Sequence, residues 1–344
     1  MDNKMPAEIE EESMVVLSED KTNESYGFYP DKRPIEVYLD YGFIPLDKPR
    51  GPSSHEVVAW VRKMLKKEKA GHSGTLDPGV SGLLPIALGN ATKALGLFLL
   101  GPKEYVSVVR LHNDVPQAKL DSVLEEFTGP IYQRPPQKSS VKRVIRPRTI
   151  YKMDVIEKVG RLMVIRINCE AGTYIRKLVY DIGEVLAVGA TMVELRRTKV
   201  YHLSEDQGLV RLHEFAEAVH RWKEKDDEQD LRTLIRPIEG VLQPFKKVFV
   251  RDSAIDAVCH GAQLAVPGLT KFSFNIARGD LVVMLSLKGE LVALGKAVMN
   301  SDEIEESPRG IAVKTERVIM SQETYPKMWK HKVEPTSNPN LKER

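Results

Sequence analysis

The sequence predicts an α+β protein in which a mixed, largely antiparallel sheet flanked by helices is followed by a small β-barrel-like second domain. Strand patterns come in runs, with helical patterns between only some of them, and this order argues against a strict strand–helix–strand wind. Beyond residue 246 the strands become short and evenly spaced, with glycine turns at Gly261, Gly268, Gly279 and Gly289. The length of 344 residues agrees with two domains.

Composition divides the chain into four parts. Residues 1–34 form an acidic tail with few apolar residues, which is not expected to order itself alone. Residues 35–246 form the larger domain, residues 247–322 the smaller one, and residues 323–344 a basic tail. The sequence leaves open whether the acidic tail packs on the second domain.

Composition also excludes several classes of protein. Cys169 and Cys259 lie far apart in apolar surroundings, which excludes a disulfide framework and argues against a cysteine-based zinc site. The eight histidines show no metal-ligand spacing, so we expect no metal. No apolar run reaches the roughly 18 residues of a membrane span, and the acidic N-terminus does not resemble a signal peptide. We therefore expect a cytoplasmic protein with no membrane partner.

Several helices are predicted in the larger domain, and two of them begin beside the segments that carry the motifs. Ser53 and Glu56 have the spacing of a capping box, so a helix is expected to follow Ser53. A second helix is expected to open at Thr173. Its apolar residues recur at helical spacing. They are Ile175, Leu178, Val179, Ile182 and Leu186.

The loop from Gly71 to Gly82 carries the residue most suited to chemistry. Its glycines permit close backbone approach and positive φ, and Pro78 favours an extended conformation at Asp77. A carboxylate is thus presented by a stiff loop directly before a buried strand. The alternative is an Asx-type turn, in which the Asp77 side chain bonds only its own backbone.

This loop resembles the active-site motif of the TruB family of pseudouridine synthases, Gly-Thr-Leu-Asp77-Pro-x-x-x-Gly-Leu-Leu-Pro. Five further segments resemble family motifs in the same order, and the resemblance spans roughly residues 35–322. These segments are Leu46–His55, Lys103–Tyr105, Arg134–Lys142, Glu170–Arg176 and Glu194–Thr198. One motif alone would be weak, but an ordered set is specific.

The resemblance is greatest to the archaeal and eukaryotic, dyskerin-like branch, which supplies the catalytic subunit of H/ACA ribonucleoprotein particles. Ser53–Trp60 and Gly71–Gly74 resemble that branch, and His260–Gly268 resembles the first turn of a PUA domain. The chain lacks a long lysine-rich tail, which favours an archaeal-type protein. It departs from the pattern at Gly79, where a basic residue is expected, and this puts one RNA contact in doubt.

The resemblance implies roles for four residues. Asp77 would be the nucleophile that isomerises uridine, and Arg176 would pair with it. Tyr105 would lie against the flipped base and Leu195 on the opposite wall of the pocket. Without the motifs, these three partners would be interpreted as a surface arginine, a half-buried strand tyrosine and a core leucine.

Other residues are implied to contact substrate or RNA. Tyr174 flanks the pocket or simply packs, and His72 contacts RNA rather than serving in acid–base chemistry. Residues 134–152 form a basic stretch without acids, which we interpret as a mobile loop over RNA, with a solvated face as the alternative. The RNA-binding residues expected from the motifs are Lys48, which would also support the loop, and Lys142, Arg143, Arg146 and Arg148.

The resemblance implies no cofactor, and it implies partners. They are an H/ACA guide RNA, rRNA and tRNA, a small zinc-ribbon protein, a glycine–arginine-rich protein and, through the complex, a kink-turn-binding ribosomal-type protein. Three functions compete. They are a guide-dependent pseudouridine synthase, a standalone tRNA pseudouridine synthase and a non-catalytic RNA-binding scaffold. The intact Asp77 motif argues against the scaffold.

Overall fold

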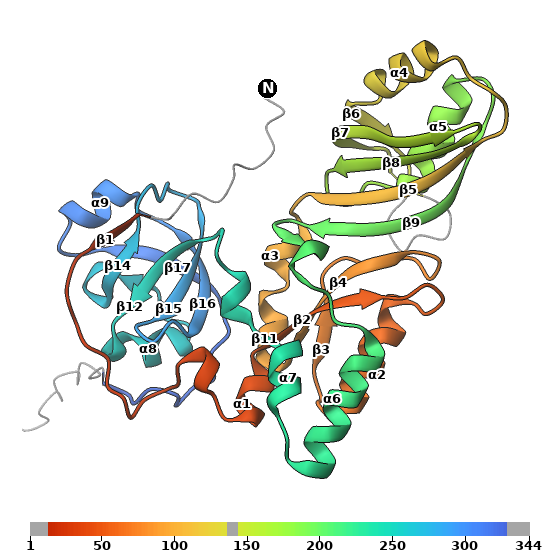
Figure 1. The fold of residues 1–344 in the computed structure, drawn as a ribbon. Helices are drawn as coiled ribbons and strands as arrows, with labels where there is room; N and C mark the ends of the chain where they lie inside the picture. The colour runs from red at the N-terminus through yellow and green to blue at the C-terminus, as the bar shows by residue number, and fades with distance from the viewer. Residues whose placement is uncertain (1–12, 136–143, 329–344) are drawn as a thin grey trace, which may run out of the picture. The chain divides into compact units, whose positions relative to one another are not determined.

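The computed structural model describes residues 13–135 and 144–328, which divide into two compact units (Figure 1). Unit 1 comprises the described part of Asp31–Pro244. Unit 2 comprises the described parts of Glu12–Pro30 and Phe245–Arg344. The second unit is therefore built from two segments that are far apart in sequence, with Asp31–Pro244 between them.

Unit 1 contains a ten-stranded sheet whose main path runs β11–β2–β4–β9–β5–β8–β7–β6, with β3 on β4 and β10 on β9 (Figure 1). Neighbours pair antiparallel except β4 and β9, which are parallel and meet only at Ser81–Gly82 and Arg196–Arg197. The predicted mixed, largely antiparallel sheet is confirmed. Its strands are β2 (Gly42–Lys48), β3 (Ala70–His72), β4 (Ser81–Leu88), β5 (Lys103–Leu111), β6 (Gly129–Gln133), β7 (Arg146–Val159), β8 (Leu162–Cys169), β9 (Ala190–Val200), β10 (Leu203–Ser204) and β11 (Arg236–Pro237).

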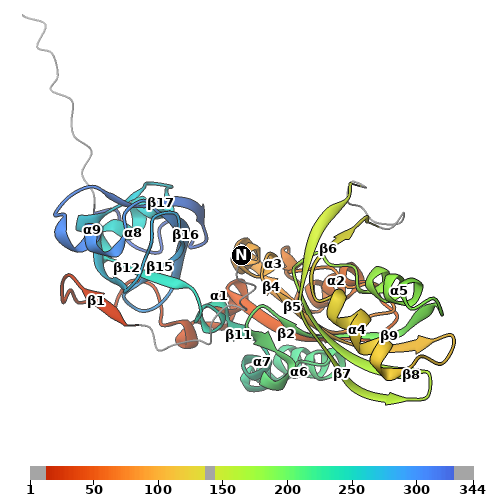
Figure 2. The ribbon, with the colours of Figure 1, turned by 90° about the horizontal axis from the view of Figure 1, so that it is seen from above.

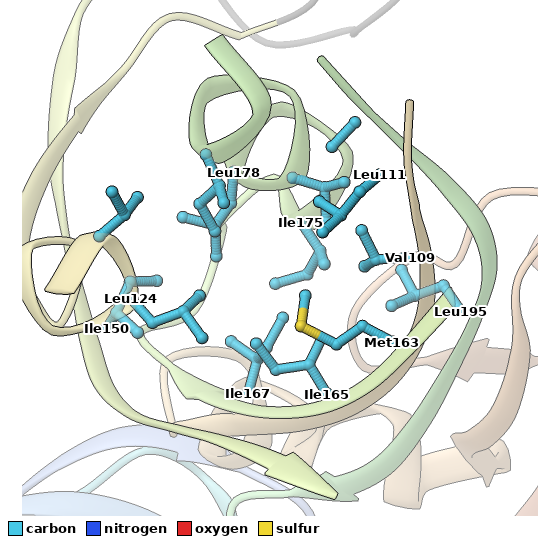
Figure 3. Close-up of a cluster of buried hydrophobic side chains, with 14 of the residues drawn as sticks. Val109, Leu111, Leu124, Ile150, Met163, Ile165, Ile167, Ile175, Leu178 and Leu195 are labelled. Atoms are coloured by element: carbon cyan, nitrogen blue, oxygen red, sulfur yellow. The ribbon is translucent and has the colours of Figure 1, made fainter. Parts of the chain in front are cut away.

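The short β4–β9 contact divides the sheet into two halves, each with its own core. Around β2 and β4, the core is closed by α1, α2, α6 and α7. Around β5, β7 and β8, it is closed by α4 and α5 (Figures 2 and 3). The helices are α1 (Ile35–Asp40), α2 (Ser54–Leu65), α3 (Gly96–Leu99), α4 (Gln117–Glu126), α5 (Ile175–Val185), α6 (Leu212–Lys225) and α7 (Gln229–Leu234).

The helices predicted after Ser53 and from Thr173 are both present. At α2 the capping box is complete, because the Ser53 hydroxyl accepts from the Glu56 N–H at 3.2 Å and Glu56 accepts from the Ser53 N–H at 2.7 Å. α5 begins at Ile175, two residues after the predicted start, and its five predicted apolar residues are all buried. Local sequence therefore determines these two helices well.

Unit 2 contains a seven-stranded sheet in the order β1–β14–β12–β15–β16–β17–β13. Only β12 and β15 pair parallel, and α8 and α9 pack beside the sheet (Figure 1). The elements are β1 (Met14–Val16), β12 (Lys246–Val250), β13 (Leu264–Ala265), β14 (Leu269–Ser273), β15 (Leu281–Ser286), β16 (Leu291–Ala297), β17 (Ile311–Val318), α8 (Asp252–Cys259) and α9 (Ser301–Glu306).

Part of each predicted tail belongs to unit 2. Strand β1 pairs with β14, although residues 1–34 were expected to form a tail. The carboxylate of Glu290 is buried and accepts from the Phe28 N–H at 2.8 Å and from the Tyr325 hydroxyl at 2.7 Å. Composition misjudged these segments because a few specific hydrogen bonds and one strand pairing can order a polar stretch.

Two negative findings apply to residues 13–135 and 144–328. No helix there is both long and apolar enough to cross a bilayer. No group of three or more acidic, histidine or cysteine side chains is placed there to hold a metal ion.

Candidate active site

The loop between β3 and β4 is held by buried donors that bind its backbone carbonyls. Arg197 of β9 donates to the carbonyl of Gly74 at 2.9 Å. The hydroxyl of Ser54, the first residue of α2, donates to the carbonyl of Leu76 at 3.0 Å and accepts from its N–H at 2.9 Å. Because Ser54 is itself buried, these bonds are shielded from water.

The second half of the loop is held in the same way. The Lys48 ammonium donates to the carbonyls of Pro78 at 3.3 Å and Val80 at 2.7 Å. The Gly51 N–H also donates to Pro78 at 2.8 Å. Carbonyls at alternate positions of the loop are thus bound from the protein interior, while Asp77, between two of them, is exposed.

Asp77 forms an ion pair with Arg176. The Oδ2 atom of Asp77 lies 2.7 Å from Nη2 of Arg176, which is in the first turn of α5. Their side chains are 59% and 64% exposed, so the pair adds little to stability. No backbone N–H within the described residues bonds this carboxylate, so the contact observed differs from the Asx-type turn. The ion pair directs the carboxylate of Asp77 towards the first turn of α5.

Tyr105 and Leu195 come from adjacent strands, β5 and β9. Tyr105 pairs with Arg197, and Ser107 with Leu195. Burial raises the pKa of the Tyr105 phenol, the nearby Arg197 lowers it and Asp77 raises it, so Asp77 and Tyr105 act on each other electrostatically. The phenol is neutral at physiological pH. Leu195 is 9% exposed and packs in the core of the β5–β8 half (Figure 3).

Arg197 is a component of this region to which the sequence analysis assigned no role. Its side chain is 1% exposed, and among residues 13–135 and 144–328 no carboxylate forms an ion pair with it. Burial lowers the pKa of its guanidinium, while Tyr105 raises it. The alternation of side chains along a strand could have indicated that Arg197 is buried. Arg197 lies two residues after the buried Leu195, so both side chains point to the same side of β9.

Lys48 requires a correction. It was expected among the RNA-binding residues, but its side chain is fully buried and its ammonium donates to the carbonyls of Pro49, Pro78 and Val80. Burial lowers the pKa of this ammonium, and the charge of Asp77 opposes that shift. With its three donors bound inside the protein, Lys48 holds the loop and has no donor left for a phosphate.

His72, at the end of β3, lies beside His55 with ring centroids 5.1 Å apart. Burial, and then the charges of His55 and Arg197, lower the pKa of His72 to about 4. Its Nδ1 atom is buried and has no hydrogen-bond partner among the described residues. The ring is therefore neutral at physiological pH, and any contact with RNA would be a neutral one.

His72 is expected to make the protein acid-sensitive. Its pKa in the folded state is below the unfolded value, so its contribution to stability is complete above pH 6.5 and is lost as the pH falls towards about 4. Between pH 7 and pH 5 the wild type should lose about 2 kcal/mol more than His72→Gln. Urea unfolding at the two pH values measures this difference. His213→Gln, at a side chain 71% exposed, is the control, and equal losses in wild type and His72→Gln would contradict the expectation.

The structure also locates the remaining predicted residues of unit 1. Tyr174, Arg146 and Arg148 line one hollow of about 250 Å³, together with Leu100. Arg148 also pairs with Glu170 at 3.2 Å. The expected mobile loop over 134–152 is corrected for residues 146–152, because Arg146 begins β7, whose residues pair with β6 and β8. Residues 136–143 of that loop lie outside the described residues. Lys142 and Arg143 lie outside the described residues.

Family models match in succession along the chain. They are the DKCLD (NUC011) domain over residues 2–58, the N-terminal domain of TruB family pseudouridylate synthase over 62–175, the C-terminal domain of tRNA pseudouridylate synthase B over 176–243 and the PUA domain over 246–319. A probable tRNA pseudouridine synthase B of Pyrococcus abyssi is 50% identical over 325 residues, which cover 94% of this chain and 97% of the relative. The chain belongs to the TruB family of pseudouridine synthases.

Further relatives and solved structures are similar to this chain over nearly its whole length. The probable tRNA pseudouridine synthase B of Pyrobaculum aerophilum is 49% identical over 93% of this chain and 96% of its own. Among solved structures, an H/ACA RNP bound to a substrate RNA containing 2'-deoxyuridine contains a chain with a TM-score of 0.85 and 48% identity, covering 93% of this chain and 98% of that one. A Cbf5–Nop10–Gar1 complex gives a TM-score of 0.84 and 50% identity, with coverage of 92% and 96%. The resemblance to the dyskerin-like branch is confirmed.

Proposed function

We propose that this pseudouridine synthase uses Asp77 as its nucleophile and isomerises uridines of rRNA that an H/ACA guide RNA selects. The observation that carries the catalytic assignment is the 2.7 Å pair between Asp77 and Arg176, presented by a loop whose carbonyls are bound from the interior. The Asp77 carboxylate is therefore paired with Arg176 and still accessible to a substrate.

The reaction changes the atom through which the uracil ring is attached to the ribose. The bond between N1 and the ribose C1' breaks, a bond between C5 and C1' forms, and the proton on C5 leaves while N1 gains one. No oxidant or reductant is needed, so no cofactor is required. Asp77 would supply the transient covalent partner, either at the base or at the sugar.

The other pocket residues would bind the flipped base. Extruding a base costs a few kcal/mol, and stacking on an aromatic face recovers about 1–3 kcal/mol. Tyr105 would supply that face as a neutral phenol, and Leu195 the opposite apolar wall. Arg176 would orient the carboxylate while RNA covers the exposed pair and excludes water.

RNA phosphates would lie along the basic residues at the start of β7 and in the sequence before it. Arg146 and Arg148 line the hollow beside Tyr174, and Lys142 and Arg143 precede them in sequence. His72, neutral at physiological pH, would contribute a hydrogen bond or a ring face. The PUA domain would bind structured guide RNA.

The partners that we propose are those found with similar chains in solved structures. One similar structure holds substrate RNA within an H/ACA RNP, and another holds Nop10 and Gar1 with Cbf5. We propose that this chain binds a guide RNA, a small zinc-ribbon protein and a glycine–arginine-rich protein. A kink-turn-binding ribosomal-type protein would join through the complex.

A standalone activity on the T-loop uridine of tRNA is the second candidate. It is favoured by the relatives at about 50% identity, which are described as probable tRNA pseudouridine synthase B. The same Asp77 pocket would serve both substrates, so the two functions differ in how RNA is delivered.

Tritium release from RNA labelled at uridine C5 tests the proposal. The purified chain is incubated with a tRNA transcript and with an rRNA fragment, each with and without a guide RNA and the accessory proteins. We expect tritium release from rRNA only when the guide RNA and the accessory proteins are present, because pairing with the guide RNA places the target uridine at Asp77.

The other outcomes separate the candidates. Release from tRNA by the chain alone, with none from guided rRNA, would replace the guided function by the standalone one. Absence of release under every condition, with RNA still bound, would overturn the catalytic proposal and favour the scaffold.

A further inference from the structure

Helix α5, which carries Arg176, is not capped by its own sequence. Its N-cap residue is Tyr174, whose side chain does not cap the helix, and its first turn contains no acidic residue. In a capping box the third helical residue accepts from the N-cap N–H, but in α5 that residue is Lys177, and an ammonium cannot accept. In α2, by contrast, Ser53 and Glu56 of the helix's own sequence supply the cap. The start of α5 therefore depends on contacts from other elements.

Gln133, the last residue of β6, supplies the missing acceptor. Its Oε1 atom accepts from the N–H of Tyr174 at 2.9 Å, and its Nε2 atom donates to the carbonyl of the same residue at 3.1 Å. Gln133 is 2% exposed, so water does not compete for these bonds. Two bonds from one planar amide to the backbone of one residue restrict both the distance and the rotation of the α5 start.

The turn that leads into α5 is anchored at its other end to β7. The Glu170 N–H donates to the carbonyl of Thr149 at 2.8 Å, and the Glu170 carboxylate accepts from the Thr149 N–H at 3.0 Å. The hydroxyl of Thr173 donates to the carbonyl of Glu170 at 2.7 Å and closes the turn. Strands β6 and β7 pair with each other, with Gln133 opposite Arg146. Both anchors of the turn therefore belong to the strands that border the hollow with the basic residues.

We propose that Gln133 is a positioning residue that sets the start of α5, so that Arg176 meets the carboxylate of Asp77 in the geometry that the reaction needs. Arg176 is the second residue of α5, two positions after Tyr174, so the backbone carries any displacement of Tyr174 to it. The Asp77 loop is held separately, through its own carbonyls. The proposal rests on the proposed role of Asp77.

The chemistry of the two bonds requires an amide. One bond needs a donor and the other an acceptor, and of the side chains of this length only glutamine offers both at neutral pH. In Gln133→Glu the ionised carboxylate would still accept from the Tyr174 N–H but would place a second oxygen against the Tyr174 carbonyl. Protonation of that carboxylate restores the donor, and burial favours the protonated form. The protonation state of Gln133→Glu therefore reports on this link.

The first test compares Gln133→Leu, Arg176→Ala and the double variant by single-turnover tritium release at saturating RNA. Gln133→Leu removes both bonds and should slow turnover by about 100-fold, the cost of displacing a reacting group by about 1 Å. Arg176→Ala should be at least as slow. Because Gln133 acts through Arg176, the double variant should lie within about threefold of Arg176→Ala alone. The RNA affinity of Gln133→Leu should stay within about threefold of wild type.

The second test uses pH. The rate of Gln133→Glu relative to the wild type should rise by at least about tenfold as the pH falls from about 8.5 to about 6, because the protonated acid donates to Tyr174 as the amide does. The corresponding ratio for Gln133→Leu should stay constant over the same range, since leucine does not titrate. Circular dichroism at each pH confirms that the variants are folded.

Two controls separate this role from general effects of the substitutions. Gln117→Glu makes the same change at an exposed side chain of α4, which bonds Asp121 at 2.8 Å, and its relative rate should not change with pH. Tyr38→Phe removes a buried hydrogen bond of 2.6 Å to the carbonyl of Ile235 in the other half of unit 1, and it should turn over like the wild type. The activity of the wild type and its loss in Asp77→Asn test the proposed function separately.

Three results would overturn the inference while leaving the proposed function intact. One is a wild-type rate in folded Gln133→Leu. Another is a double variant whose loss equals the product of the two single losses, because Gln133 would then act independently of Arg176. The third is a relative rate of Gln133→Glu that does not change with pH. Since that variant keeps the shape of the side chain, it tests the inference even if Gln133→Leu does not fold.

Discussion

Replacing Asp77 by asparagine is expected to lower the single-turnover rate by at least about 10⁴-fold, because an amide cannot form the covalent intermediate. RNA binding should persist. The side chain keeps nearly the same shape, and the loop is held through its backbone by Ser54, Lys48 and Arg197. Tritium release under single-turnover conditions measures the first effect, and a filter-binding titration the second.

Asp114→Asn provides the control for this experiment. Asp114 also forms an exposed ion pair with an arginine, Arg161 at 3.3 Å, but it lies outside the Asp77 loop. Loss of the Asp114 carboxylate should leave the single-turnover rate unchanged. If Asp77→Asn retained a rate within about tenfold of the wild type, the nucleophile assignment would have to be abandoned.

Gly82→Ala is expected to cost more than about 4 kcal/mol of folding free energy, the range of severe steric and backbone changes. A Cβ at this position would lie 2.2 Å from the carbonyl oxygen of Arg197, and the φ of Gly82 is +104°. The clash is with backbone at the single parallel contact between the half-sheets, so neither strand can move alone. Urea unfolding followed by circular dichroism measures the loss.

Gly79→Ala is the matched substitution in the same loop. No heavy atom lies within 4 Å of its Cβ position, and its φ is outside the left-handed region. The change should alter stability by less than about 0.5 kcal/mol, as exposed substitutions usually do. A similar loss in both variants would show that the loop is sensitive to any side chain, and the argument from the β4–β9 contact would fail.

Local sequence was sufficient where the determining contacts are local. The capping box of Ser53 and Glu56 and the apolar face of α5 both follow from spacing within one helix, and both are confirmed. The fold class could be predicted for the same reason. Runs of strands with few helices between them rule out a wound parallel sheet before any tertiary contact is considered.

The prediction failed for contacts between residues that are far apart in the sequence. The motifs placed Lys48 among the RNA-binding residues, yet its side chain is buried, and two of the three carbonyls that it binds come from residues about 30 positions later. Arg197 meets Gly74 across 123 positions of sequence. No pattern of spacing encodes such pairs. The resemblance implied that Lys48 supports the Asp77 loop, but the contribution of Arg197 became visible only in the structure.

The pairing of β1 with β14 has a consequence for the order in which the protein is made. About 250 residues of sequence separate Val16 from its partner Lys271. At about 5–20 residues per second, β1 waits roughly 12–50 s on the ribosome before β14 exists. All of Asp31–Pro244 is synthesised in that interval, so the larger unit has its complete sequence first. The smaller unit therefore has its first strand made before Asp31–Pro244 and its remaining strands made after it.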